Sequence, residues 1–489
     1  MRTLRGLALA AWGSALLVGV VAAAPPAAAP QTLFDPHRVI SPPLRPVRAP
    51  KPERVALPNG AVVFLLEDHT FPVVSGTAYF PSGPALVPAG QTGLDELTGD
   101  AMRRGGTASH SGPMLDERLA AIGASITTSL SGDLGYGGFR CQREDLDEVL
   151  GLFADLLRNP GFPDDKLKLA KLSLQQAIAS RDDEVFSIVS RLSLEAVYGK
   201  HSLWGRSPES ATVDAVDRAA CLRLHDAIFV PERMVLSIYG DFDAAALKRQ
   251  VAARFADWPR SGTPRPPQPA VTDSTRARLL FANKEDVTQS GLLLAELGHR
   301  ADEPDDAAMD VVIQALGGGG QSRLNRVIRT ERGLAYSTGA AAGEGYLRPG
   351  ALTAWSLTRN DSALTALGLL RGALADIVHA PLAPEEFAAA KQSVQNQFVF
   401  NFEQRSAALF RAAWYEVLGY PADYLDVYQR QLAAVTNESA FAAARRWIHP
   451  ERMTVIVVGN EKQFERPIES AGLPVERVKL GTAAPPEKN

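Results

Sequence analysis

The pattern of apolar and polar residues along the chain predicts a mixture of short strands and long helices. Apolar runs of strand length cover residues 61–66, 73–80, 134–140, 291–297 and 351–356. Apolar and alanine residues recur instead at helical spacing over 164–181 and over 384–418, and we expect one long helix in each segment. Because strands and helices do not alternate one to one, the pattern favours an α+β fold over a doubly wound parallel sheet.

One segment of this pattern occurs twice. Residues 231–241 read PERMVLSIYGD and residues 450–460, 219 positions later, read PERMTVIVVGN. Each copy follows an alanine-rich helical stretch, at 216–228 and at 437–448, and combines a proline turn, an apolar strand and a glycine turn. The repeat predicts two homologous halves of about 220 residues each.

The boundaries of these halves follow from composition. Residues 258–276 carry five prolines and almost no apolar periodicity, which is typical of an exposed linker. We therefore expect a first half at 53–257, a second half at 277–475 and a tail at 476–489.

The N-terminal segment has the pattern of an export signal. Arg2 and Arg5 precede an uncharged apolar run of about 17 residues, and small residues follow near Ala23 and Ala24. The sequence thus predicts a cleaved signal at 1–24 and a proline-rich lead-in at 25–52. The mature protein is then expected in the periplasm or secreted, with no membrane attachment. An uncleaved membrane anchor is the alternative.

Composition excludes several classes of protein. Hydrophobic residues make up 46% of the 489 residues and charged residues 22%, as in folded soluble proteins. A formal charge of −4 offers no basic face for nucleic acid. Two cysteines, Cys141 and Cys221, are too few for a disulfide scaffold; in an oxidising compartment they either pair or remain buried thiols.

Local catalytic motifs are absent from the sequence. There is no G-x-S-x-G, S-x-x-K or C-x-x-C, and no two of the eight histidines have the H-x-x-x-H spacing of a zinc-binding helix. The glycine run at 317–320 lacks the Gly-Lys-Ser/Thr ending of a phosphate-binding loop. The residues alone therefore indicate neither a nucleophile nor a metal site.

A series of short motifs nevertheless resembles one family. The motifs in the first half are Leu57-Pro58-Asn59-Gly60, Gly93-Leu94, Tyr198-Gly199-Lys200-His201 with Gly205-Arg206, and Pro231 leading to Gly240-Asp241. Those in the second half are the segment LGGGGQSRL from Leu316 and Arg332-Gly333-Leu334-Ala335-Tyr336. In this order, over about residues 50–465, they resemble the M16 (insulinase or pitrilysin-like) zinc peptidases. The resemblance implies two related halves, each a mixed or antiparallel sheet covered by helices.

The chain departs from this family at the zinc site. Active members carry H-x-x-E-H after the Gly-Leu pair, but this chain has Glu96, Gly99 and Asp100 at the three positions. Gln176 stands where the third ligand, a glutamate, is expected. The resemblance thus implies a degenerate site with no metal or other cofactor in this chain. Two other interpretations of the carboxylates are a different cation site and surface pairs with nearby arginines.

The second half keeps a pair that the family places against substrate. Arg329 and Tyr336 have the spacing of this pair, and their guanidinium and phenol groups can donate to a scissile carbonyl as it gains negative charge. The alternative is that Arg329 pairs with an acid such as Glu331 while Tyr336 packs in the core.

Together, the resemblance implies a non-zinc subunit. Two-half members pair into a closed chamber, and in some pairs one chain supplies zinc while the other has a decayed motif. We expect this chain to pair with a zinc-bearing homologue, or with itself, and to supply Arg329 and Tyr336 in trans for peptide hydrolysis. The alternative is a non-enzymatic binding or assembly protein that keeps the shell.

Overall fold

The computed structural model describes residues 51–264, 268–343, 345–400 and 404–481. The predicted export signal and nearly all of the proline-rich lead-in lie outside these residues. Within the described residues, no single helix is long and apolar enough to span a membrane; one bent pair, Asn360–His379 with Pro384–Phe398, meets that test by length and composition only.

The first half is built on a six-stranded mixed sheet. Its strands are β1 (Glu53–Ala56), β2 (Val62–Glu67), β3 (Val73–Pro81), β4 (Ser125–Ser131), β5 (Leu134–Gln142) and β6 (Val235–Gly240). They lie in the order β1-β2-β6-β3-β5-β4, with β2 and β6 parallel and all other neighbours antiparallel.

The second half repeats this sheet. Its strands are β7 (Arg278–Asn283), β8 (Gln289–Leu297), β9 (Ala335–Ala342), β10 (Ala351–Arg359), β11 (Thr454–Gly459) and β12 (Val475–Arg477). The order β12-β7-β11-β8-β10-β9 places β11 where β6 lies in the first sheet, so the two PERM segments lead into equivalent strands. These paired mixed sheets confirm the predicted α+β fold. The last strand runs to Arg477, two residues beyond the boundary expected for this half.

Helices cover both sheets. The first half contains α1 (Leu94–Gly105), α2 (Gly112–Ala121), α3 (Leu146–Arg158), α4 (Asp164–Ser180), α5 (Val185–Tyr198), α6 (Ser210–Asp214), α7 (Arg218–Ile228) and α8 (Ala244–Phe255). The second contains α9 (Asp306–Gly317), the π-helix η6 (Asn325–Thr330), α10 (Ala363–His379), α11 (Pro384–Phe400), α12 (Arg405–Leu418), α13 (Tyr424–Ala434) and α14 (Asn437–Trp447). Apolar residues at helical spacing form the contact, as in α3, where Val149, Phe153 and Leu157 are buried together.

The helices that matter most here occupy equivalent places. The chain enters α1 from β3 and α9 from the corresponding strand β8. Helix α1 packs on the edge strand β4 and on α4, and α9 packs on the edge strand β9 and on α11. The duplication therefore relates α1 to α9, and α4 to α11.

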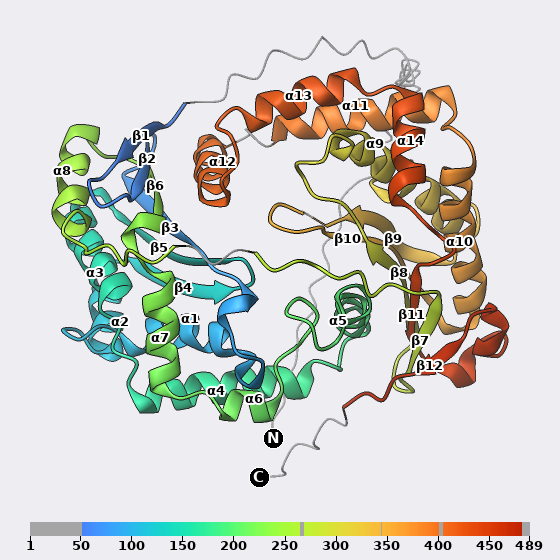
Figure 1. The fold of residues 1–489 in the computed structure, drawn as a ribbon, viewed down its shortest axis with the longest axis horizontal. Coiled ribbons are helices and arrows are strands. Elements are labelled where there is room, and N and C mark those ends of the chain that lie inside the picture. Colours follow the sequence, from blue (N-terminus) through green and yellow to red (C-terminus); the bar gives the residue numbers. More distant parts are fainter. Residues whose placement is uncertain (1–50, 265–267, 344, 401–403, 482–489) are drawn as a thin grey trace, which may run out of the picture. The chain divides into compact units, whose positions relative to one another are not determined.

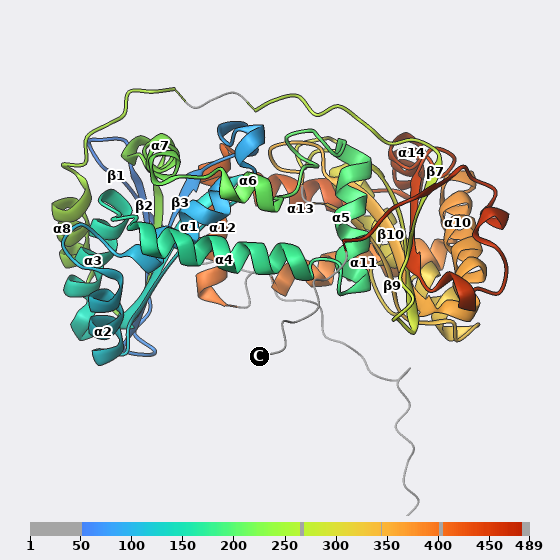
Figure 2. The same ribbon diagram turned by 90° about the horizontal axis from the view of Figure 1, so that it is seen from below.

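One helix from each half packs on the sheet of the other half. Helix α5 packs on β8 and β11 of the second sheet, and α12 packs on β2, β3 and β6 of the first (Figures 1 and 2). Buried residues from both partners share these contacts: Ile188 and Leu192 with Leu293 in one, Leu409 with Phe64 in the other.

This exchange overturns the prediction of one helix over 384–418. The segment forms two helices, α11 and α12, because they pack on different partners. Helix α11 covers α9 in its own half, whereas α12 covers the sheet of the other half. Alanine-rich helical spacing continues through both helices, so the pattern alone gives no sign of the break.

Candidate functional site

The four positions of the degenerate zinc motif lie on two neighbouring helices. Glu96, Gly99 and Asp100 lie on α1 and Gln176 on α4, and the two helices are in contact. Glu96 and Gln176 are exposed. Both Asp100 carboxylate oxygens accept hydrogen bonds from Arg104 Nε, at 2.7 and 2.8 Å, as an i,i+4 pair one helical turn apart.

Gly99 is held against the backbone of the edge strand. A Cβ atom there would lie 2.9 Å from the carbonyl carbon of Ser129 and closer still to the backbone nitrogen of Leu130. The Thr128 hydroxyl donates to the Gly99 carbonyl at 2.6 Å, which fastens the helix to β4 at this point. The position that holds the glutamate of the inverted zinc motif is therefore closed to any side chain.

The donor groups at these positions do not fit zinc. Of four positions, Gly99 offers no side-chain donor, Gln176 offers a neutral amide, and Asp100 is engaged by Arg104. Partial desolvation raises the pKa of the Glu96 carboxyl, and the negative charge of Asp95 raises it further. Across the described ranges, no group of three or more His, Cys, Asp or Glu side chains is placed to hold a metal ion.

In the second half, the structure brings Arg329 and Tyr336 together. The Arg329 guanidinium carbon lies 5.0 Å from the centroid of the Tyr336 ring, which is cation–π contact distance. Arg329 lies at the end of η6 and Tyr336 at the start of β9, so a short turn brings the two side chains side by side. Gly333 makes that turn with φ +62°, in the left-handed region that favours glycine.

Several contacts that sequence reasoning missed fix this turn. The buried Asn325 amide donates to Gly319 O at 3.0 Å and to Thr338 O at 3.4 Å, which ties η6 to the glycine run and to β9. The Thr358 hydroxyl of β10 donates to Leu334 O at 2.7 Å. Asn325 and Thr358 are positioning residues. Asn325 lies close to the Arg/Tyr motif in the sequence, which offered a signal for it, whereas no signal pointed to Thr358.

Both members of the pair are accessible to a ligand. Tyr336 is 80% exposed and so does not pack in the core. Glu331, the acid considered as a partner for Arg329, instead accepts from Arg326 at 3.0 Å. Among the residues that the structure describes, Arg329 forms no ion pair and donates no hydrogen bond, so its guanidinium donors are available.

The two cysteines lie in the first half and are not joined. Cys141 is in β5 and Cys221 in α7, and both are buried free thiols. Burial raises the pKa of Cys141 to about 12 and also raises that of Cys221, so neither thiol is activated as a nucleophile.

The two sheets and the equivalent helices on them define a chain of two related α+β halves. Residues 215–394 match the family described as the peptidase M16 inactive domain. An uncharacterised zinc protease of Mycobacterium tuberculosis is 27% identical over 309 residues, covering 62% of this chain and 69% of the relative. The non-peptidase homolog YmxG of Helicobacter pylori is 21% identical over 416 residues, covering 81% of this chain and 91% of the homolog.

Solved structures share the fold. The peptidase M16 inactive domain of Pseudomonas fluorescens aligns with a TM-score of 0.75 at 20% identity, over 85% of this chain and 99% of that one. The periplasmic protease PqqL of Escherichia coli aligns with a TM-score of 0.70 at 15% identity, over 87% of this chain and 47% of PqqL. The chain thus resembles the M16 peptidase family in a sequence match over residues 215–394 and in its fold.

Proposed function

We propose that this chain is the non-zinc subunit of an M16-type peptidase and supplies Arg329 and Tyr336 to a zinc-bearing homologue. The observation that carries the proposal is the contrast between the two sites. The α1 positions do not offer zinc a fitting set of donors and are closed at Gly99, whereas the Arg329–Tyr336 pair is assembled, exposed and, among the described residues, free of competing partners.

The chemistry of the pair suits a substrate carbonyl. Arg329 brings up to five N–H donors and Tyr336 one O–H donor. Donors fixed near an oxygen that gains negative charge stabilise the transition state for peptide hydrolysis, by about 3 kcal/mol for one donor. The ring of Tyr336 holds the guanidinium in place without using its donors.

The test is peptide hydrolysis by this chain, by a homologue carrying H-x-x-E-H, and by their mixture. We expect the mixture to exceed the homologue alone, and we expect Arg329→Ala and Tyr336→Phe each to lower the mixture's kcat/KM by about 10²-fold. Because both side chains are exposed, neither change is expected to shift the melting temperature of the isolated chain measurably.

Arg326→Ala is the matched control. Arg326 lies on the same helix, is also exposed, and is paired with Glu331, so its loss is expected to leave hydrolysis unchanged. A mixture no faster than the homologue alone contradicts the proposal. So does full activity in the mixtures containing Arg329→Ala and Tyr336→Phe.

A second candidate function is a non-enzymatic binding or assembly role. The closed Gly99 position favours it, since this chain cannot regain hydrolysis on α1 by side-chain changes alone. Stable association with a homologue whose activity is unaffected by Arg329→Ala is the outcome expected for this role.

The place of action in this proposal is outside the cytoplasm. It rests on the charged, apolar and small-residue pattern of residues 1–24. Mass determination of the exported protein tests it, with cleavage expected near Ala23–Ala24.

A further inference from the structure

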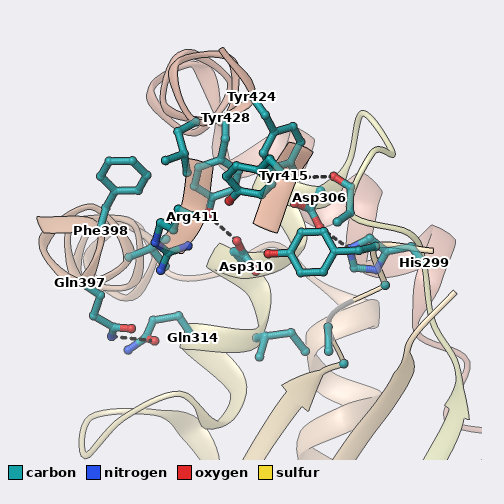
Figure 3. A pocket seen from close by; sticks show the side chains of 18 of the residues that line it. His299, Asp306, Asp310, Gln314, Gln397, Phe398, Arg411, Tyr415, Tyr424 and Tyr428 are labelled. Carbon is teal, nitrogen blue, oxygen red and sulfur yellow. Dashed lines mark hydrogen bonds and ion pairs between the residues drawn. The ribbon is translucent and has the colours of Figure 1, made fainter. Parts of the chain in front are cut away.

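The second half contains a cavity beside the two helices that correspond to those carrying the degenerate zinc motif in the first half. It has a volume of about 600 Å³ and lies along α9 and α11, the counterparts of α1 and α4, with α12, α13 and residues 342–343 and 345–346 completing its wall (Figure 3). This volume is within the range of small-molecule sites.

Two carboxylates on α9 face this cavity. Asp306 and Asp310 lie one helical turn apart, and both line the cavity. Asp306 contacts His299 Nε2 at 3.0 Å, and the Tyr428 hydroxyl donates to Asp310. Within the described part of the chain, no Lys or Arg forms an ion pair with either carboxylate. Arg411 also lines the cavity and His299 contacts Asp306, so Asp310 is the carboxylate there that no Lys, Arg or His meets in a direct ion pair among the described residues.

Aromatic rings form the opposite wall. Figure 3 shows Tyr415, Tyr424 and Tyr428 above the α9 carboxylates. The Tyr424 hydroxyl donates to Ala301 O at 2.7 Å, and the Tyr428 hydroxyl is held by Asp310, so both rings are fixed in orientation. Tyr428 also stacks on Phe398, with centroids 6.1 Å apart. Fixed aromatic faces beside carboxylates are the surroundings that stabilise an organic cation.

His299 supplies an unused polar atom at the same cavity. Its side chain is only 4% exposed, and its ring lies 5.4 Å from that of Trp447. Nε2 contacts Asp306, while Nδ1 is buried with no hydrogen-bond partner among the described residues. A buried ring nitrogen without a partner is costly and indicates a missing donor or acceptor at this position.

We propose that this cavity binds an organic cation, an ammonium or guanidinium group on a slender chain, either as a free amine or as the basic side chain of a peptide. Asp310 and Asp306 neutralise the cation, and the tyrosine rings cover it. His299, Asp306 and Asp310 all line the cavity, but among the described residues they are not grouped so as to hold a metal ion, and the donor set suits an organic cation. The proposal does not depend on the Arg329–Tyr336 pair, and its readout is binding to the isolated chain.

The charged groups around the carboxylates predict the pH dependence of binding. The pKa of Asp310 is raised to about 6: burial is the largest cause, the neighbouring charge of Asp306 adds to the rise, and Tyr428 and His299 oppose it. Burial also raises the pKa of Asp306. Arg411 is the one Lys or Arg among the described residues lining this cavity. A cation prefers ionised Asp310, so affinity is expected to increase from pH 5 to pH 7.5.

The experiment compares guanidinium probes with neutral analogues by titration calorimetry. N-acetylarginine amide is compared with N-acetylcitrulline amide, which has the same shape without the charge. An alanine heptapeptide with a central arginine is compared with the same peptide containing citrulline. We expect both arginine probes to bind, and Asp310→Asn to weaken them at least about tenfold. Binding of the peptide at least tenfold tighter than the free probe identifies a peptide side chain as the source; equal binding identifies a free cation.

Asp361→Asn is the control, because Asp361 is exposed and lies outside the cavity. Three results overturn the proposal: no arginine probe binds the wild-type chain, citrulline probes bind as well as arginine probes, or Asp310→Asn binds unchanged. If Asp310→Asn does not fold, the pH dependence of arginine-probe binding to the wild-type chain is the test. Affinity that rises at least fivefold from pH 5 to pH 7.5 supports the proposal, and affinity that is flat over this range overturns it.

Discussion

Helices α1 and α9 occupy the same place in the two halves, yet they have different surroundings. Both pack on the edge strand of their sheet, and both carry two carboxylates four residues apart. On α1, Glu96 is exposed and Asp100 pairs with Arg104. On α9, Asp306 and Asp310 lie against a tyrosine-lined cavity. The comparison teaches that the duplicated scaffold fixes where a site can form, while the side chains that cover the helix decide whether it does.

The largest effect is expected at the glycines through which each helix packs directly against its edge strand. At Gly99 a Cβ meets the backbone of Ser129 and Leu130, and at Gly317 it would lie 2.8 Å from Ala340 Cβ and closer to the Ala340 backbone nitrogen. Because backbone cannot move aside as a side chain can, we expect Gly99→Ala and Gly317→Ala each to lower the free energy of unfolding by about 3 kcal/mol. Urea denaturation measures this.

Gly368→Ala is the matched control. Gly368 lies within α10, and a Cβ added there would have no neighbouring atom within 4 Å among the described residues. Alanine is the better helix former, so this change is expected to raise stability by about 0.5–1 kcal/mol. If all three substitutions change the free energy of unfolding alike, α1 and α9 do not pack against their edge strands as closely as described.

The second test compares the carboxylates of the two helices. The pKa of Asp310 is about 6 in the folded chain, above its ordinary value of 3.8, so folding favours the protonated form. Stability from this group is fully present below pH 3.8 and is lost as pH rises through 6. We therefore expect Asp310→Asn to stabilise the ligand-free chain by about 2 kcal/mol at pH 7.5 and by little at pH 4.

Glu96→Gln provides the counterpart on α1. Desolvation also raises the pKa of Glu96, but its side chain is exposed, so we expect Glu96→Gln to stabilise the chain less than Asp310→Asn does at pH 7.5 and to have little effect at pH 4. Thermal melts at pH 4 and pH 7.5 distinguish the two. An Asp310→Asn variant that is no more stable than wild type at pH 7.5 would show that the α9 carboxylate is well compensated in the ligand-free chain.

Sequence reasoning reached the more apolar strands, the duplication and the type of fold because these depend on local patterns and on a repeated segment. It did not predict β1, β4, β7, β9 or β12. It also indicated Arg329 and Tyr336, which lie close together in the sequence. It missed the break between α11 and α12, since helical spacing continues across it. It also treated Gly99 only as a lost catalytic position, because the approach of β4 is a contact between segments about 30 residues apart. The α9 cavity draws on five separate segments, and no local pattern signals such a site.

A smaller effect is expected where the halves meet through the partly buried ion pair of Asp133 and Arg348. Arg348 also lies 4.3 Å from the centroid of the Trp204 ring, which holds its guanidinium in place. With both side chains about one-quarter exposed, a double-mutant cycle with Arg348→Ala and Asp133→Ala is expected to give a coupling free energy of about 1–1.5 kcal/mol. Coupling near zero would contradict a fixed contact between the β4–β5 turn and the second half.

The smallest effect is expected at the other connection, between Arg54 of β1 and Glu416 of the exchanged helix α12. Its geometry is good, with Arg54 Nε and Nη2 donating to the two carboxylate oxygens at 3.2 and 2.7 Å. The two side chains are 48% and 30% exposed, however, and water screens their attraction. We expect the cycle with Arg54→Ala and Glu416→Ala to give about 0.5 kcal/mol, falling towards zero in 1 M NaCl, while the Asp133–Arg348 coupling persists. Equal coupling in both cycles would contradict the screening expected for this more exposed pair.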